Sequence, residues 1–203
     1  MRILVTGGAG YLGSVLLRKL LAKGYQVRLI DALWYGKEPI EDLLPNKNFE
    51  LIQNDIRNLV VTVKALKDVD AVIHLASIVG MPASSIEPKS SEEINYLATK
   101  NIAELCQLHN IDTYIFASTC SIYGSQSETL ITEKSPTDPL DFYAKQKYLS
   151  ERDCEVCQGY RLNEKALAVK IDDNHIGQIT KKSITGCLKW FKSLESKLTL
   201  NEI

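Results

Sequence analysis

The chain has 203 residues, of which 45% are hydrophobic and 24% are charged, and its formal net charge is -1. This composition is typical of a soluble globular protein with a buried core, and the near-neutral charge gives no indication of a nucleic-acid partner. No apolar run approaches the ~20 residues of a membrane-spanning helix, and a strand-like run follows Met1-Arg2 directly, which leaves no room for a signal peptide. We therefore expect a cytoplasmic protein without a membrane span.

The cysteines are odd in number and lack the spacing of a disulfide framework, which predicts free thiols. They are Cys106, Cys120, Cys154, Cys157 and Cys187. The pair Cys154-x-x-Cys157 has no second pair and no nearby histidine, so we expect no metal site.

Residues 1–31 follow the pattern of a dinucleotide-binding βαβ unit, in which a short apolar strand leads into a glycine-rich turn and a helix. Gly7 permits the tight turn, Gly10 lets the backbone approach a pyrophosphate, and Gly13 lets the helix pack closely on the strand. The pyrophosphate would lie on the free N–H groups at the start of the helix.

A helix and a second strand follow this turn. The apolar helical positions are Leu12, Leu16 and Leu20. Gly24 offers a left-handed stop, and residues 26–30 form a strand pattern that ends in Asp31. A carboxylate at this strand end suits hydrogen bonds to both adenosine ribose hydroxyls and repels a 2'-phosphate, which favours NAD over NADP. The alternative is that Asp31 is only a solvated strand end.

Strand and helix patterns alternate through the next hundred residues. We expect strands at 49–52, 70–75 and 113–117, helices at 60–67, 90–109 and 142–158, and a loop at 76–88. Ser90 and Glu93 fit a capping box for the second helix. The alternation predicts an α/β fold, a doubly wound parallel sheet (Rossmann fold) with helices on both faces and ligands beyond the carboxyl ends of the strands.

Tyr143 and Lys147 are four residues apart, which places them on one face of the predicted helix. The ammonium can stabilise a phenolate, and a tyrosine with a pKa near ~10 needs a shift of about 3 units to act near neutrality. Such pairs also occur on solvated helix faces, and Thr119 and Ser121 could serve only as turn caps. His74, His109 and His175 are scattered without a catalytic partner, so we interpret them as structural or exposed.

Several motifs stand in order along the chain. They are the glycine turn, Asp31, Asp55-Ile56-Arg57, His74-Leu75-Ala76-Ser77, Asn95, Ser118-Thr119-Cys120-Ser121-Ile122-Tyr123-Gly124 and Tyr143-x-x-x-Lys147. This succession resembles the NAD-dependent epimerase/dehydratase branch of the extended short-chain dehydrogenase/reductase superfamily, the group around UDP-glucose 4-epimerase. The resemblance covers roughly residues 1–158, the expected NAD-binding domain.

The resemblance implies a set of site residues. Those expected at NAD are Gly7, Gly10, Tyr11, Leu12, Gly13, Asp31, Asp55, Ile56, Leu75, Ala76, Ser77, Asn95, Tyr143 and Lys147. Thr119 matches the catalytic Ser/Thr of the family, with Tyr143 as acid/base and Lys147 on the nicotinamide ribose. Ser121 is the expected substrate contact.

The resemblance also implies the reaction. A hydroxyl of a nucleotide sugar, held by Thr119, would lose its proton to Tyr143 while its carbon gives a hydride to NAD. Dehydratases of the family usually carry an Asp-Glu pair where this chain has Cys120-Ser121, and the enzymes that make GDP-fucose carry a cysteine at the position of Ser121. These differences favour 4-epimerisation or plain oxidoreduction.

Residues 159–203 form a divergent C-terminal extension that is too short for the second domain of the family. We expect a sixth strand at 167–171 and an amphipathic helix at 181–203, so the substrate lobe is truncated. The apolar stripe of this helix consists of Ile184, Leu188, Phe191, Leu194 and Leu198. Two alternatives to a short enzyme stay open, a non-catalytic NAD-binding module and one subunit of a split enzyme. The resemblance predicts a homodimer through helices 90–109 and 142–158.

Overall fold

The chain divides into two compact units, Met1–Glu151 and Arg152–Ile203. The computed structural model describes residues 1–125, 130–132, 134–151, 170–171, 174–175, 178 and 184–194. No helix in these ranges is both long and apolar enough to cross a membrane.

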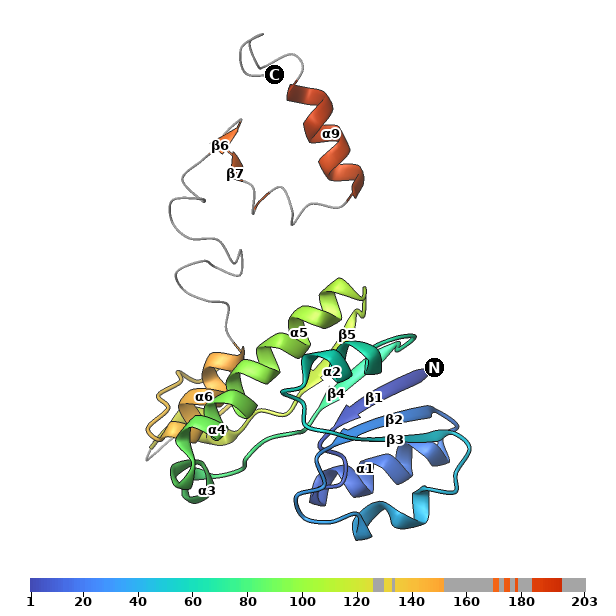
Figure 1. Ribbon diagram of the computed structural model, residues 1–203. Coiled ribbons are helices and arrows are strands. Elements are labelled where there is room, and N and C mark those ends of the chain that lie inside the picture. The colour runs from blue at the N-terminus through green and yellow to red at the C-terminus, as the bar shows by residue number, and fades with distance from the viewer. Residues whose placement is uncertain are drawn as a thin grey trace. The chain divides into compact units, whose positions relative to one another are not determined.

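The first unit contains a five-stranded parallel sheet with the strand order β3-β2-β1-β4-β5 (Figure 1). The strands are β1 (Arg2–Thr6), β2 (Gln26–Asp31), β3 (Phe49–Gln53), β4 (Ala71–His74) and β5 (Thr113–Phe116). Thr6 at the end of β1 pairs with Ile30 of β2 and with His74 of β4, so the carboxyl ends of the central strands meet at one edge. The predicted doubly wound parallel sheet is confirmed.

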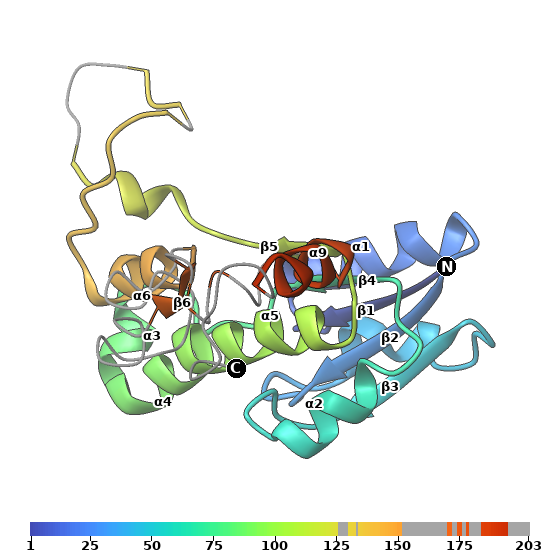
Figure 2. The same ribbon diagram turned by 90° about the horizontal axis from the view of Figure 1, so that it is seen from above.

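Helices cover both faces of this sheet. The helices of the first unit are α1 (Tyr11–Ala22), η1 (Glu38–Leu43), α2 (Leu59–Ala65), α3 (Met81–Ile86), α4 (Pro88–Glu92), η2 (Glu93–Ala98), α5 (Thr99–Leu108), η3 (Cys120–Tyr123) and α6 (Phe142–Glu151). Figures 1 and 2 show α1 on one face of β1 and β2, with α2 and α5 on the other.

The apolar run of β1 supplies both cores, because successive side chains of a strand point to opposite faces. Ile3 and Val5 pack with Leu17 of α1. Leu4, between them, packs with Ile102 of α5 in the second core. All five side chains are at most 4% exposed, and burying each stabilises the fold by roughly 1.5–3 kcal/mol. A strand that is apolar on both faces therefore lies in the middle of the sheet.

At two positions near the turn after β1, other backbone lies so close that only glycine fits. Gly7 has a φ of +72°, and a Cβ on it would lie 2.5 Å from the backbone N and Cα of Ala76. A Cβ on Gly13 would lie 2.7 Å from the backbone C and O of Gly8. Gly13 therefore packs the first turn of α1 against the glycine turn itself, whereas the sequence predicts packing against the strand.

The segment between β4 and β5 differs from the prediction. The expected loop at 76–88 contains α3, and the helix expected to begin with a capping box at Ser90 begins at Pro88. Proline suits the first helical turn because it lacks an N–H and its φ is fixed. The Ser90 hydroxyl donates to Glu87, and the Glu93 carboxylate accepts from Arg57, so the capping box is wrong. A π-helical turn, η2, then separates α4 from α5.

In the second unit, β6 (Lys170–Ile171) pairs antiparallel with β7 (Asn174–His175). Lys170 and Ile171 form a strand within the range predicted as the sixth strand, 167–171, and this strand belongs to a two-stranded sheet with β7. Residues 167–169 lie outside the described residues.

Helix α9 (Ile184–Leu194) forms within the range predicted as an amphipathic helix. Leu198 lies outside the described residues, as do Cys154, Cys157, the end of the predicted helix 142–158 and the predicted domain boundary after residue 158. Cys106 and Cys120 are free thiols.

His74 joins the sheet to α5 as a buried, neutral imidazole. Its Nδ1 lies 2.6 Å from Thr6 Oγ1, and its Nε2 lies 2.9 Å from Thr99 Oγ1. The Thr99 hydroxyl donates to the carbonyl of Asn95, so Thr99 accepts from Nε2–H, and Nδ1 is left to accept from Thr6. Burial, assisted by the charge of Lys147, lowers the pKa of His74 to about 3.

We predict that Gly13→Ala costs about 3 kcal/mol of unfolding free energy, because the new Cβ clashes with backbone that has no room to move. Gly24→Ala is the matched control, since Gly24 has a positive φ but no atom within 4 Å of its Cβ position. It should cost about 1 kcal/mol from backbone strain alone. Urea unfolding followed by circular dichroism measures both, and equal losses would contradict the close approach.

We also predict that His74→Gln reduces the loss of stability in acid. The wild-type imidazole must stay neutral in the fold, with a pKa of about 3 against about 6.5 when unfolded. The folded chain therefore binds fewer protons across this range, and stability falls by about 1.4 kcal/mol per pH unit as the pH drops below 6.5. Urea midpoints at pH 7, 6, 5 and 4 measure the difference in slope, and parallel curves would refute the neutral imidazole.

Candidate active site

A cavity of about 490 Å³ lies at the carboxyl ends of β1, β2, β4 and β5. Every residue that the sequence predicts at the cofactor lines this cavity except Asn95, which is fully buried. The structure thus brings residues from Gly7 to Lys147 together around one space. The lining also contains residues that the sequence analysis did not single out, among them Trp34, Tyr35 and Ile94.

One end of the cavity is formed by the glycine turn and the start of α1. The first backbone hydrogen bond of this helix runs from Ser14 N to Gly10 O at 2.9 Å, so the N–H groups of residues 11–13 have no acceptor within the helix. A Cβ on Gly10 would meet only Gly7 O, at 3.4 Å, so the space beside Gly10 is open. Free N–H groups, the helix dipole and open space together fit a phosphate anion.

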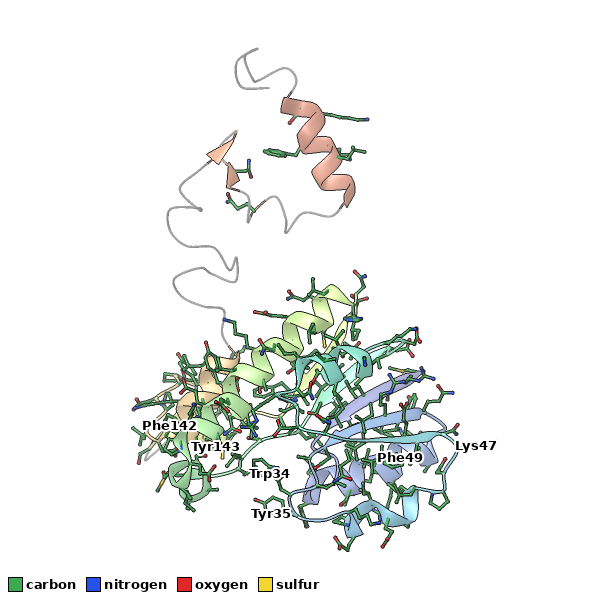
Figure 3. The ribbon with its side chains drawn as sticks, in the orientation of Figure 1. Trp34, Tyr35, Lys47, Phe49, Phe142 and Tyr143 are labelled. Carbon is green, nitrogen blue, oxygen red and sulfur yellow. The ribbon has the colours of Figure 1, made fainter. Side chains whose placement is uncertain are left out.

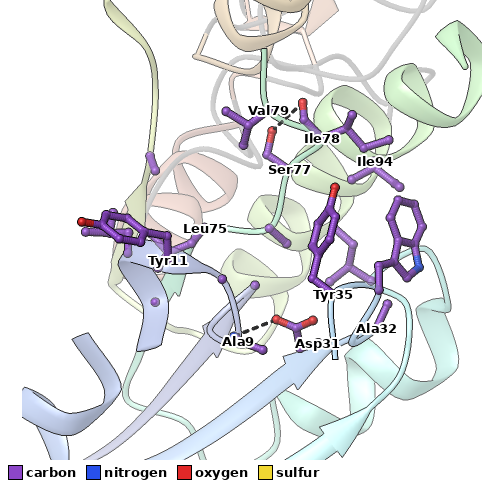
Figure 4. Close-up of a pocket in the computed structure, with 18 of the residues that line it drawn as sticks. Ala9, Tyr11, Asp31, Ala32, Tyr35, Leu75, Ser77, Ile78, Val79 and Ile94 are labelled. Carbon is purple, nitrogen blue, oxygen red and sulfur yellow. Dashed lines mark hydrogen bonds between the residues drawn. The ribbon is translucent and has the colours of Figure 1, made fainter. Parts of the chain in front are cut away.

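Asp31 lies next to this turn and holds it to the loop after β2. Its Oδ2 accepts from Ala9 N at 2.9 Å (Figure 4). Its Oδ1 accepts from Leu33 N at 2.8 Å. A carboxylate oxygen has two lone pairs, so each oxygen keeps capacity to accept from a ribose hydroxyl. The negative charge at this point opposes a 2'-phosphate, so the residues present fit NAD.

Three exposed aromatic side chains surround the mouth of the cavity. Tyr11 is 96% exposed, Tyr35 is 90% exposed and Trp34 is 54% exposed. Tyr35 stands over Asp31 in Figure 4, and Figure 3 shows Trp34 between Tyr35 and Tyr143 in that view. Exposed aromatics that converge on a cavity indicate a planar ligand group. The sequence signal that could have found them is the Trp34-Tyr35 pair, which follows Asp31 after two residues.

Asp55 lines the cavity as part of an ion-pair group. Its two carboxylate oxygens accept from Arg57 Nη2 at 2.7 Å and Nε at 3.0 Å, and Arg57 Nη1 donates to Glu93 at 2.8 Å. Burial raises the pKa of Asp55, but the hydrogen bonds and charge of Arg57 outweigh it and hold the pKa below its usual value. The group ties the end of β3 to η2 on this side of the cavity.

Lys147 forms the opposite wall and is only 2% exposed. Its Nζ donates to Ala117 O at 2.9 Å and lies 4.6 Å from the ring centroid of Phe116 and 6.0 Å from that of Tyr143. Burial lowers its pKa to about 8. An ammonium has three donors, so two remain for a ligand as far as the described residues show.

Tyr143 is 7% exposed and lines the cavity together with Ser77 and Lys147. Burial raises the pKa of Tyr143 above its usual value, the hydroxyls of Ser77 and Thr119 oppose this rise, and the charges of Asp141 and Cys120 add to it. The catalytic roles expected of Thr119, Tyr143 and Lys147 stay predictions.

Thr119 lines an adjoining open groove that shares Ser118 with the cavity. Thr119 caps η3, because its Oγ1 accepts from Ser121 N at 3.3 Å, and its hydroxyl donates to Ser121 Oγ at 3.3 Å. The predicted substrate contact thus lies beside the predicted catalytic hydroxyl, outside the space that the cofactor residues line.

Asn95 lies behind the cavity wall and fixes the segment after β4. Its Oδ1 accepts from Ser77 Oγ at 2.9 Å and from Ile78 N at 2.7 Å, while its Nδ2 donates to Ile78 O at 2.9 Å. Nδ2 also donates to Gln146 Oε1 at 2.9 Å, and Ser91 donates to the same oxygen at 2.8 Å. Sequence reasoning missed Gln146 and Ser91, because no local pattern marks a partner more than fifty residues away.

Comparisons with known proteins agree with this geometry. The model of the NAD dependent epimerase/dehydratase family matches residues 3–169. A putative UDP-glucose 4-epimerase of Methanocaldococcus jannaschii is 36% identical over 151 residues, which cover 73% of this chain and 48% of the relative. A UDP-glucose 4-epimerase of Azospirillum brasilense is 33% identical over 166 residues, which cover 79% of this chain and 46% of the relative.

Solved structures give the same result. The UDP-glucuronic acid 4-epimerase of Bacillus cereus, in complex with UDP-glucuronic acid and NAD, is 34% identical with a TM-score of 0.69, covering 74% of this chain and 50% of that one. The UDP-Glc/GlcNAc 4-epimerase of Campylobacter jejuni is 31% identical with a TM-score of 0.69, covering 74% of this chain and 46% of that one. The chain spans about half the length of these relatives. By its glycine turn, its parallel sheet and this match, the chain belongs to the NAD-dependent epimerase/dehydratase family.

Proposed function

We propose that this chain carries the cofactor half of an NAD-dependent sugar-nucleotide epimerase or oxidoreductase, with Thr119, Tyr143 and Lys147 as its catalytic residues. The observation that carries the proposal is the buried ammonium of Lys147, which lies beside the Tyr143 phenol and across one cavity from the glycine turn. A buried cation with spare donors is costly unless a ligand with acceptor groups completes its surroundings. Relatives crystallised with a nucleotide sugar and NAD support that ligand class.

The residues that line the cavity would each bind the part of the cofactor that suits their chemistry. The free N–H groups of residues 11–13 would bind the pyrophosphate, and Asp31 would bind the adenosine ribose. The spare donors of Lys147 would bind the nicotinamide ribose hydroxyls. Bound NAD supplies a hydride acceptor, and in its reduced form a hydride donor.

The chain's own residues would move the proton. Thr119 would hold a sugar hydroxyl beside the phenol, and Tyr143 would take the hydroxyl proton as base and return it as acid. The ammonium of Lys147 favours the phenolate, whereas burial of Tyr143 opposes it, so Tyr143 acts as base only when positive charge nearby outweighs burial. Return of the hydride to the opposite face of the keto-sugar would give the 4-epimer.

We also propose a homodimer through the segments at 90–109 and 142–158. Apolar side chains on the described parts of these segments support it, because Leu97, Leu108 and Leu149 are 45%, 71% and 49% exposed. The cytoplasmic location expected from the sequence stays a prediction.

We predict that Tyr143→Phe lowers the rate of interconversion of UDP-glucose and UDP-galactose by about 10²–10⁴-fold, because it removes the acid/base hydroxyl and leaves the ring. Tyr148→Phe, on the same helix, is the matched control and should keep the wild-type rate. Proton NMR of the anomeric signals measures interconversion, and absorbance measures any NADH released.

Two results would contradict the catalytic proposal. One is equal activity of the Tyr143→Phe variant. The other is tight NAD binding by the wild type without turnover across a panel of nucleotide sugars, which would point to an NAD-binding module.

We predict that Trp34→Ala weakens NAD binding about tenfold, since stacking of a base on an aromatic ring contributes roughly 1–3 kcal/mol. Trp34 lines the cavity beyond Asp31, where the adenine would lie once its ribose is bound. The chain has two tryptophans, so Trp190→Phe is the control and should leave affinity unchanged. Isothermal calorimetry measures both variants, and an unchanged affinity in Trp34→Ala would remove Trp34 from the adenine site.

A further inference from the structure

Residues 33–36, here called the aromatic turn, reverse the chain just after β2. Gly36 N donates to Leu33 O at 3.0 Å, and Leu33 and Gly36 have φ values of +55° and +88°. Trp34 and Tyr35 occupy the two central positions of the turn. A positive φ is uncommon for a residue with a side chain, and such a conformation persists where other contacts hold it.

Two contacts hold Leu33 in this conformation. Its backbone N donates to Asp31 Oδ1 at 2.8 Å, and its side chain packs against the core that contains Leu17 of α1. The other oxygen of Asp31 accepts from Ala9 N at 2.9 Å. One carboxylate therefore holds the aromatic turn at a fixed place beside the glycine turn.

The ring of Tyr35 lies at the rim of the cavity. Tyr35 lines the cavity although 90% of its surface is exposed, and Figure 4 shows its ring above Asp31. Leu33 anchors the turn in the core and leaves this ring outside it. An exposed aromatic ring at the rim gains a partner when a ligand fills the space below it. The group below Tyr35 is the one that Asp31 binds.

We propose that Tyr35 covers the adenosine ribose of bound NAD and thereby slows release of the cofactor. The identity of the ligand rests on the proposed function. The ring would lie between solvent and the hydrogen bonds that the ribose hydroxyls donate to Asp31. Hydrogen bonds shielded from water are electrostatically stronger than exposed ones. The cover therefore acts through the ribose hydroxyls, and it needs the ring of Tyr35 but not the phenolic hydroxyl.

This role differs from the one proposed for Trp34, which is to stack on the adenine. A ring stacked on the base contributes the same binding energy whether or not the ribose hydroxyls are present. A cover over the ribose depends on those hydroxyls. Removal of one hydroxyl from the ligand therefore separates the two roles.

The first test measures the rate at which the full chain releases NADH. Protein loaded with NADH is mixed with a large excess of NAD in a stopped-flow instrument, and the change in NADH fluorescence gives the release rate. Tyr35→Ala should release NADH about tenfold faster and bind it at a rate within about twofold of the wild type, because the ring obstructs departure. Tyr35→Phe should keep the wild-type release rate.

Ile86→Ala is the control for loss of an exposed apolar side chain. Ile86 is 80% exposed and does not line the cavity, so its variant should release NADH at the wild-type rate. A wild-type release rate in Tyr35→Ala would overturn the inference. So would a release in Tyr35→Phe as fast as in Tyr35→Ala, because the hydroxyl and not the ring would then retain NADH.

The second test compares ADP with 2'-deoxy-ADP by isothermal calorimetry. Tyr35→Ala should weaken ADP about fivefold and 2'-deoxy-ADP only about twofold, because the deoxy ligand lacks one of the hydrogen bonds that the ring shields. Equal losses for the two ligands would overturn the placement of Tyr35 over the ribose.

Neither test needs turnover. A chain that loses NADH faster in Tyr35→Ala but converts no nucleotide sugar would refute the proposed catalysis and leave the role of Tyr35 standing. An active chain in which Tyr35→Ala releases NADH at the wild-type rate would do the reverse.

Discussion

The buried ammonium of Lys147 is the constraint on which the arrangement of the site depends. A cation removed from water costs several kcal/mol unless nearby groups replace its hydration. Here the carbonyl of Ala117 and the face of the Phe116 ring do so in part, and both belong to β5 and its end. The remaining cost appears as a pKa of about 8. Helix α6 is thereby held against the end of β5, and Tyr143 on the preceding turn is held beside the cavity.

The facing wall of the cavity depends on backbone contact instead of charge. Gly7 lies so close to the backbone of Ala76 that a side chain has no room, and this contact keeps the glycine turn at the end of β4. The same segment continues to Ser77, which lines the cavity together with Tyr143. One short stretch after β4 therefore connects the anion-binding turn with the proposed acid/base. This explains how residues from both ends of the first unit share one space.

The sequence predicted the parts of the fold that depend on residues close together in the chain. The apolar run of β1 indicated a central strand, and the four-residue spacing of Tyr143 and Lys147 placed them on one helical face. The capping box failed because Glu93 accepts from Arg57, 36 residues earlier, a contact that no local pattern contains. The hydrogen bonds of Asn95 and the position of Trp34 at the cavity were missed for the same reason. Each depends on how loops from distant parts of the chain meet.

The polar groups behind this wall of the cavity share one property, which is that they are neutral. His74 is held neutral between two threonines, and Asn95 and Gln146 are amides. A charged imidazole behind this wall would repel Lys147 and add a second positive charge near the phenol. In a buried site of low effective dielectric constant, that charge would be felt strongly. A neutral frame instead leaves Lys147 to favour the phenolate and burial of Tyr143 to favour the phenol. A base that must return its proton as an acid needs both forms within reach, and two opposing influences of moderate strength provide that.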